Sequence, residues 1–212
     1  MHLHLLHQSA FVLRAAHGGA IAVDLGYEVP AETVAGLSVE AVLTSHLHPD
    51  HFHRPHLDAL EVPLFCPEDV AEAIGSPPFR VTKITAGVEF DVAGFSVTPF
   101  ASDHGPHLSA AIDNLGFAFS SGDKNLLFLG DMAAASSIPP GNWDAILIPV
   151  GGSKVFSAEE AAAYIAALGH RGRVVPIHFH GRSDRACGER FALLAADLCD
   201  VRLLGVGETM EV

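Results

Sequence analysis

The sequence lacks the features of a secreted, membrane-embedded or disulfide-stabilised protein. Its 212 residues contain no run of about 18 consecutive apolar residues, which argues against a membrane-spanning helix. The first residues show no basic segment followed by an apolar stretch and a cleavage site, so we expect a cytoplasmic protein. The three cysteines, Cys66, Cys187 and Cys199, are widely spaced and odd in number, and they predict neither a disulfide framework nor a cysteine-bound zinc.

Positive charge is also scarce. The chain has only 12 lysines and arginines but 25 aspartates and glutamates, and its formal net charge is −13 with neutral histidines. Most of such a surface repels nucleic acid, so we expect a small-molecule substrate and neither a nucleic-acid nor a membrane partner. Bound divalent cations would make one site locally electropositive, so an anionic substrate is compatible with the negative net charge. The sequence is also compatible with a homo-oligomer. The 14 histidines outnumber all lysines and arginines together, which points to metal binding.

Short apolar segments separated by turns predict a layered α/β or α+β architecture, with one domain over residues 1–212. Strands are predicted at residues 10–13, 20–24, 39–44, 62–65, 81–85, 95–100, 117–120, 125–129, 145–150 and 174–177. Gly122-Asp123 predicts a hairpin turn between two of these strands. Helices are predicted at residues 55–60, 67–74, 158–168 and 189–198. The helix at 158–168 opens with the capping-box spacing of Ser157 and Glu160.

The densest group of potential metal ligands directly follows a predicted strand. In an extended segment, His46 and His48 project to the same side and can bind one ion together. Pro49 then turns the chain, so that Asp50 and His51 can face a second ion. Imidazole and carboxylate ligands suit zinc, manganese or iron, and the absence of cysteine ligands argues against a purely structural zinc site.

The spacing of His46, His48, Asp50 and His51 resembles the H-x-H-x-D-H signature of the metallo-β-lactamase superfamily. The resemblance implies the four-layer αβ/βα sandwich of that fold. It also implies a dinuclear centre of two divalent metal ions, with zinc favoured and manganese or iron as alternatives.

Further ligands of that family follow in a fixed order along the chain. The resemblance implies His104 after a middle strand, with His107 as the alternative. It implies Asp131, in a Gly-Asp pair after an apolar strand, as the carboxylate that bridges both metals. It implies His178 at the end of a late strand, with His180 as the alternative. The first metal would then be held by His46, His48 and His104, and the second by Asp50, His51 and His178.

Weaker similarities extend over nearly the whole chain. Asp24 resembles the acidic residue that supports the metal loop from beneath in this family, orienting ligands without binding metal. The segments at 148–152 and 176–179 are similar to the branch that contains ascorbate-6-phosphate lactonase. The chain departs from that branch at Gln8, where a histidine is common, and at Leu25-Gly26, which follow Asp24 where an Asp-Pro pair is common. Lys154 follows a Gly-Gly pair, where it is either a contact for an anionic substrate or an ordinary loop lysine.

The resemblance implies a hydrolase that uses a metal-activated hydroxide on a small ester, lactone or phosphoester. Asp50 is the candidate catalytic residue, because it could hold the nucleophile or pass a proton to the leaving group. A cyclic phosphodiesterase or a nuclease of the same fold is the alternative, and the charge of −13 disfavours the nuclease. Outside the hydrolases, a di-iron oxidoreductase or a non-catalytic metal-binding relative remains open.

Overall fold

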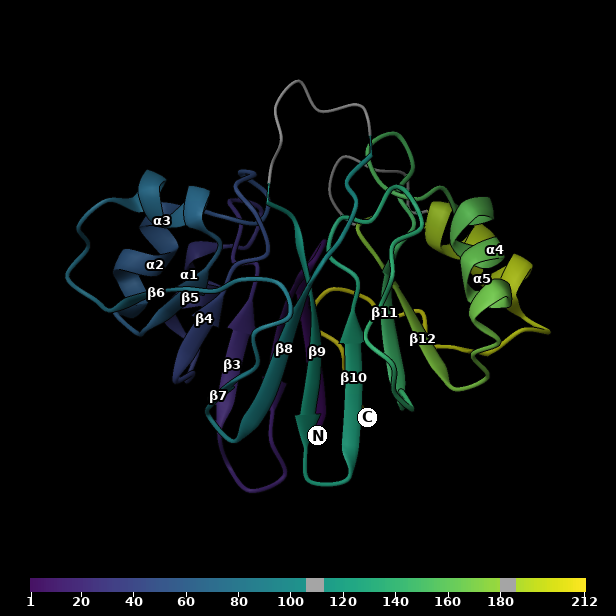
Figure 1. Ribbon diagram of the computed structural model, residues 1–212, viewed down its shortest axis with the longest axis horizontal. Helices are drawn as coiled ribbons and strands as arrows, with labels where there is room; N and C mark the ends of the chain where they lie inside the picture. The colour runs from purple at the N-terminus through teal and green to yellow at the C-terminus, as the bar shows by residue number, and fades with distance from the viewer. Residues whose placement is uncertain (106–112, 180–185) are drawn as a thin grey trace.

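The computed structural model describes residues 1–105, 113–179 and 186–212, which form two facing β-sheets with helices on their outer sides (Figure 1). The first sheet has the strand order β14 (Thr209–Glu211), β1 (His2–His7), β2 (Ala10–Arg14), β3 (Ala20–Val23), β4 (Ala41–Leu43), β5 (Leu64–Cys66) and β6 (Val81–Lys83). The second has the order β13 (Asp200–Val201), β12 (Arg173–Ile177), β11 (Ala145–Pro149), β10 (Lys124–Phe128), β9 (Leu115–Ser121), β8 (Phe95–Ala101) and β7 (Phe90–Val92).

Helices cover the outer face of each sheet and complete a four-layer sandwich (Figure 1). The first sheet carries α1 (Ala31–Ala35), α2 (Arg54–Leu60) and α3 (Glu68–Ile74), and the second carries α4 (Ala158–Leu168) and α5 (Ala186–Ala195). Parallel pairing runs from β3 to β6 and from β10 to β13, where helices or longer loops connect successive strands. The expected αβ/βα sandwich is therefore confirmed.

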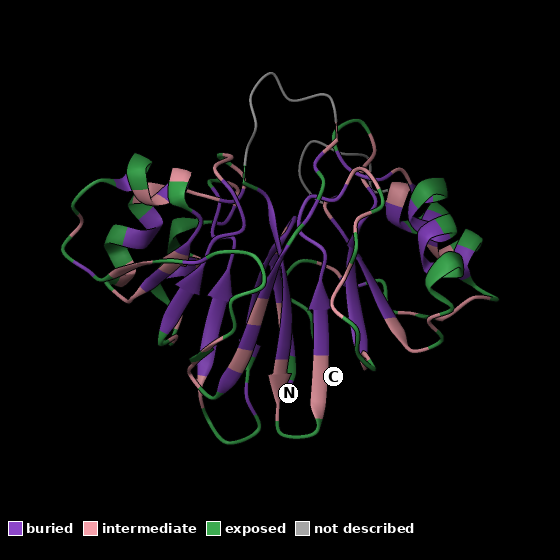
Figure 2. Cartoon of the chain, viewed as in Figure 1, coloured by how far each residue is buried: buried purple, intermediate pink, exposed green. Residues whose placement is uncertain are grey.

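Three hydrophobic cores hold the layers together. The central core lies between the sheets, and its largest members include Phe11, Phe117 and Phe128. Two outer cores pack the helices onto the sheets, around Ile165 on one side and Val70 on the other. Figure 2 shows this arrangement as buried strands and as helices with one buried and one exposed face. Each fully buried large apolar side chain contributes about 1.5–3 kcal/mol relative to exposure, so this packing fixes the positions of the strand ends.

Local sequence signals account for several elements. The side chain of Ser157 accepts a hydrogen bond from the backbone N–H of Glu160, and the Glu160 carboxylate accepts one from the N–H of Ser157. These bonds cap the start of α4. The helix α4 ends at Gly169, whose φ of 65° is the left-handed conformation that glycine adopts without strain. The predicted hairpin at Gly122 also forms, since β9 and β10 pair from Ser121 and Lys124 onward.

The differences from the sequence expectation concern short or terminal elements. The strands β7, β13 and β14 and the helix α1 were not expected, because segments of two to five residues carry too little periodicity to be recognised. Helix α5 begins at Ala186 and ends at Ala195, three residues earlier at each end than predicted. In the part of the chain that the structure describes, no helix is long and apolar enough to cross a membrane.

Candidate metal centre

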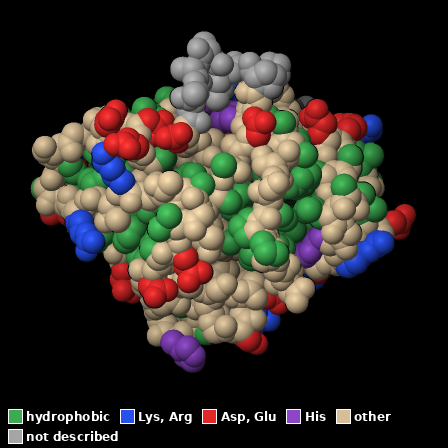
Figure 3. Space-filling model, viewed as in Figure 1, with side chains coloured by type: hydrophobic (Ala, Val, Ile, Leu, Met, Phe, Trp, Pro, Cys, Tyr) green, Lys and Arg blue, Asp and Glu red, His purple; other side chains and the backbone are tan. Residues whose placement is uncertain are grey.

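Loops at the carboxyl ends of strands from both sheets meet at one edge of the sandwich, the upper edge in Figure 1. His46 follows β4, His104 follows β8, Asp131 follows β10 and His178 follows β12 directly. Figure 3 shows histidine and acidic side chains at this edge of the surface. Because each loop begins where a buried strand ends, the packed sheets determine how far apart these side chains lie.

The seven predicted metal ligands form two adjacent groups. The ligand atoms in each group lie within 4.8 Å of one another. One group contains His46, His48, His104 and Asp131, and the other contains Asp50, His51 and His178. The structure therefore brings together each residue set that the sequence assigned to one metal, with Asp131 in the first group.

A single oxygen of Asp131 connects the two groups. Its Oδ2 lies 3.5 Å from Nε2 of His104 and 3.8 Å from Nε2 of His46. The same oxygen lies 3.2 Å from Nε2 of His51 and 3.0 Å from Nε2 of His178. Four imidazole nitrogens from both groups thus face one buried carboxylate oxygen, which is the arrangement required of a bridging ligand.

Several polar atoms of these groups have no hydrogen-bond partner in the described part of the chain. They are Nε2 of His51, both ring nitrogens of His104, Nδ1 of His178 and Oδ1 of Asp131, and all five are buried. A buried polar atom without a partner costs free energy, which coordination to a cation would recover. The donor set consists of imidazole nitrogens and carboxylate oxygens. The residues therefore fit two divalent cations of the zinc, manganese or iron class.

Asp24 and Ser45 orient two of the histidines from beneath. Asp24 Oδ1 accepts a hydrogen bond from the backbone N–H of Ser45, and Oδ2 accepts one from its hydroxyl. Asp24 Oδ2 also lies 2.8 Å from Nδ1 of His51, and Ser45 Oγ lies 2.9 Å from Nδ1 of His46. When each ring carries its single proton on Nδ1, its Nε2 can present a lone pair to a cation. Asp24 thus contacts His51 directly and His46 through Ser45.

Asn114 supports Asp131, and the sequence analysis did not identify it. Its side-chain Nδ2 donates to the backbone oxygens of Ser102 and Asp131, at 3.0 and 3.2 Å. Gly130 precedes the aspartate with a φ of 61°, and a Cβ atom there would lie 2.7 Å from the carbonyl oxygen of Leu115. The Gly-Asp pair is therefore required by a left-handed turn against a neighbouring strand.

The electrostatics of the metal-free centre couple the carboxylates to the histidines. Burial alone would raise the pKa of Asp131, but His178 and His51 hold it well below its usual range. Burial alone would lower the pKa of His51, but Asp131 and Asp24 hold it well above its usual range. Burial dominates at His46 and lowers its pKa, with a further contribution from the charge of His51. At neutral pH the ionised Asp131 thus pairs with a protonated His51, whereas His46 is neutral.

A pocket of about 640 Å³ opens beside the second group. Gln8, Asp50 and His178 line it on the metal side, while Tyr27 and Lys154 are among its outer residues. Lys154, for which the sequence left a substrate contact and an ordinary loop lysine as alternatives, is thus a lining residue of this pocket. The two alternatives to the chosen ligands, His107 and His180, lie outside the described residues.

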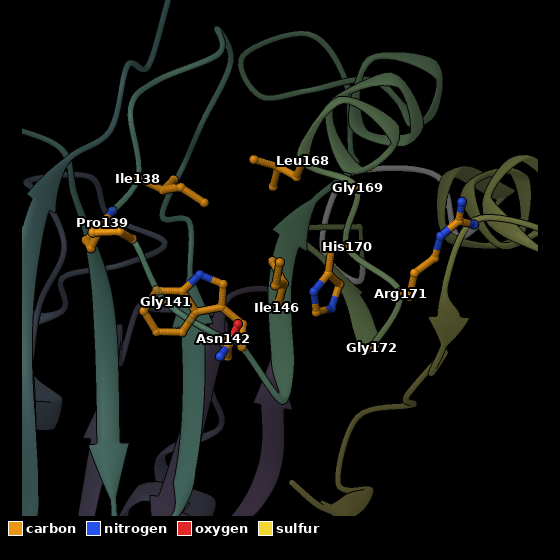
Figure 4. A pocket seen from close by; sticks show the side chains of 12 residues that line it. Ile138, Pro139, Gly141, Asn142, Ile146, Leu168, Gly169, His170, Arg171 and Gly172 are labelled. Carbon is orange, nitrogen blue, oxygen red and sulfur yellow. The ribbon is translucent and has the colours of Figure 1, made fainter.

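A second pocket lies apart from the metal centre. Its volume is about 400 Å³, and it is lined by Trp143, Ile146, His170 and Arg171 among others (Figure 4). None of the seven metal-ligand candidates is among its described lining residues. The 640 Å³ pocket is therefore the candidate substrate site.

Comparison with known proteins identifies the family. A model of the beta-lactamase superfamily domain matches residues 2–178 of the chain. The chain belongs to the beta-lactamase superfamily. It is also similar to a UPF0173 protein of Pyrococcus furiosus, with 27% identity over 180 residues that cover 82% of this chain and 81% of the relative.

Solved structures show the same fold over the whole length of this superfamily member. Igni18, a metallo hydrolase from Ignicoccus hospitalis, matches with a TM-score of 0.80 and 19% identity, and all of each chain is covered. An isothiocyanate hydrolase from Delia radicum gut bacteria matches with a TM-score of 0.79 and 19% identity, covering 100% of this chain and 99% of the other. At these identities the likeness supports the fold.

The close approach of Gly26 to the loop at 46–51, which carries the first candidate metal ligands, can be tested by substitution. A Cβ atom at this position would lie 1.8 Å from the backbone oxygen of Asp50, so no residue but glycine fits here without a shift of the backbone. We expect Gly26→Ala to displace Asp50 and to weaken zinc binding, as measured by competition with a chromogenic chelator. Gly36→Ala is the matched control, because a Cβ there meets nothing closer than 3.5 Å. Equal zinc affinity in the two variants would contradict this account.

Cation binding should release protons from the centre. Burial alone would lower the pKa of His178, but Asp131 and hydrogen bonds to Asp131 and Asp50 raise it to about 9. A cation must displace this proton, so we expect cation affinity to fall as the pH drops below about 9. Titration calorimetry at pH 7 in buffers of different ionisation enthalpy measures the protons released. A heat of binding that is independent of the buffer would show that no proton is displaced.

Proposed function

We propose that this superfamily member is a metal-dependent hydrolase that cleaves a small ester, lactone or phosphoester. The observation that carries the proposal is Asp131 Oδ2, which faces histidine nitrogens of both ligand groups beside a 640 Å³ pocket. Two cations, with zinc favoured over manganese or iron, would be held by the seven residues of the two groups. When bound, such cations polarise a substrate oxygen and activate water near neutral pH.

Asp50 is the residue of this centre suited to handle a proton. Burial alone would raise the pKa of its carboxyl, but the hydrogen bond with His178 and the charge of His51 lower it, so the group is ionised at neutral pH. Its contacts with Gln8, His51 and His178 all involve Oδ2. Oδ1 stays outside these contacts, and it can orient the attacking water or accept its proton.

The Asp50→Ala variant tests this role. We expect a loss of hydrolytic activity by orders of magnitude with a largely unchanged fold, because the variant loses both a cation ligand and the proton acceptor. Turnover of activated esters, lactones and phosphodiesters, together with circular dichroism, measures both effects. Asp91→Ala, which removes an exposed carboxylate on β7, is the control and should retain activity. Near-normal turnover in Asp50→Ala would refute the assignment.

The outer part of the pocket favours an anionic substrate. The side chain of Lys154 makes no ion pair with any residue in the described ranges, whereas Lys83, Lys124 and Arg190 each pair with a carboxylate. In a chain of charge −13, an unpaired ammonium group beside the metal centre is a ready contact for a carboxylate or phosphate. The similarity of segments 148–152 and 176–179 to the ascorbate-6-phosphate lactonase branch supports a phosphorylated lactone within this class.

Removal of the Lys154 charge should change substrate binding more than the chemical step. We expect Lys154→Ala to raise KM about tenfold for an anionic ester, and to leave its kcat and the kinetics of a neutral ester nearly unchanged. Arg80→Ala removes another exposed cation that lies outside the pocket, and it serves as the control. An equal effect of Lys154→Ala on charged and neutral esters would exclude an anion contact at this residue.

A further inference from the structure

Gln8 lies at the centre of the second ligand group, although neither the signature nor the family order assigns it a role. It follows β1 and is buried, with 6% of its surface exposed. Its side-chain Nε2 donates a hydrogen bond of 2.9 Å to Oδ2 of Asp50. The same nitrogen lies 3.3 Å from Nε2 of His178. One amide group therefore contacts two of the three residues of this group.

The chemistry of the partners determines the orientation of the amide. The ionised Asp50 carboxylate only accepts hydrogen bonds, so the amide nitrogen and not the amide oxygen must face it. The amide oxygen Oε1 then turns away from Asp50, and it has no hydrogen-bond partner among the described residues. Gln8 is also a lining residue of the 640 Å³ pocket. Its side chain thus lines the pocket beside Asp50 and His178 of the second ligand group.

The backbone of Gln8 is tied to the same group. Its carbonyl oxygen accepts a hydrogen bond of 2.9 Å from the N–H of His178. Both residues have positive φ angles, 27° for Gln8 and 62° for His178, which residues other than glycine rarely adopt. Such strained conformations persist where the surrounding structure holds them, and they cluster at functional sites. In the described part of the chain, no hydrogen bond joins Gln8 to the first ligand group.

We propose that Gln8 is a positioning residue for the second metal site. Its amide sets the orientation of Asp50, and thereby the affinity of the second cation, while the first site is independent of it. The inference rests on the proposed dinuclear function. Groups that orient a metal ligand typically change metal affinity about 10- to 100-fold when they are removed.

The test follows the binding of each cation separately. We titrate metal-free protein with zinc against a chelator and with cobalt(II) by absorbance, and obtain a dissociation constant for each equivalent. For Gln8→Leu we expect one equivalent to lose about 10- to 100-fold in affinity, while the other changes by less than about threefold. Gln8→Asn should show the same selective loss, because its amide is one methylene shorter and asparagine tolerates a positive φ.

Two further variants separate positioning from a structural role. Gln8→His restores an N–H donor at this place, and we expect it to recover most of the lost affinity. Ser9→Ala, in the same turn, removes a buried hydroxyl that has no hydrogen-bond partner among the described residues, and it should leave both affinities unchanged. Thermal unfolding of the metal-free variants shows whether each one folds.

The outcomes distinguish this inference from the proposed function. If the wild type binds two cations and the Gln8 variants bind the second equally well, the role of Gln8 is refuted and the dinuclear function stands. If both equivalents weaken together with the melting temperature in Gln8→Leu and Gln8→Asn, Gln8 is structural and the inference is overturned. If the wild type binds fewer than two cations, both the inference and the dinuclear function fail.

Discussion

The interaction on which the site depends is that of the Asp131 carboxylate with imidazoles from both ligand groups. One oxygen faces His46, His51, His104 and His178 at 3.0 to 3.8 Å, in a position where almost no water reaches it. A buried carboxylate is stable only when opposite charge surrounds it. Protonated His51 and His178 supply that charge, and two cations would supply more of it at the same place. The packed sheets bring loops of both halves to one edge, where their histidines surround this single group.

Much of the centre could be predicted because its ligands are local in sequence or directly follow apolar strands. The motif at 46–51 lies after a buried strand, and Asp131 and His178 each follow a run of apolar residues. The backbone leaves the strand conformation at Gly130 and His178, which have positive φ angles at the start of the site loops. The layered architecture could be predicted for the same reason, since long apolar strands and one capped helix leave clear periodic signals.

The remainder could not be predicted because it depends on contacts between distant segments. Asn114 touches the backbone of Asp131, and Gln8 touches Asp50 and His178, at separations from 17 to 170 residues along the chain. Neither Asn114 nor Gln8 belongs to a motif whose spacing would identify it as a residue of the site. In the sequence, Gln8 stood out only as a departure from a common histidine. The short strands β7, β13 and β14 were missed because two or three residues carry no usable period.

The charge of the chain and the chemistry of its pocket are connected through the metal centre. A net charge of −13 disfavours anionic ligands at long range, yet the pocket carries the unpaired Lys154 next to a centre built for cations. Bound cations would thus reverse the sign of the local field within a few ångströms of the substrate. Small anions would be attracted at short range, while long polyanions would still meet a repulsive surface.

Anomalous X-ray diffraction from crystals of zinc-loaded protein shows whether Asp131 bridges two cations. We expect two anomalous peaks, one among His46, His48 and His104 and one among Asp50, His51 and His178, with the Asp131 carboxylate between them. A single peak, or two peaks of which neither lies next to Asp131, would contradict it.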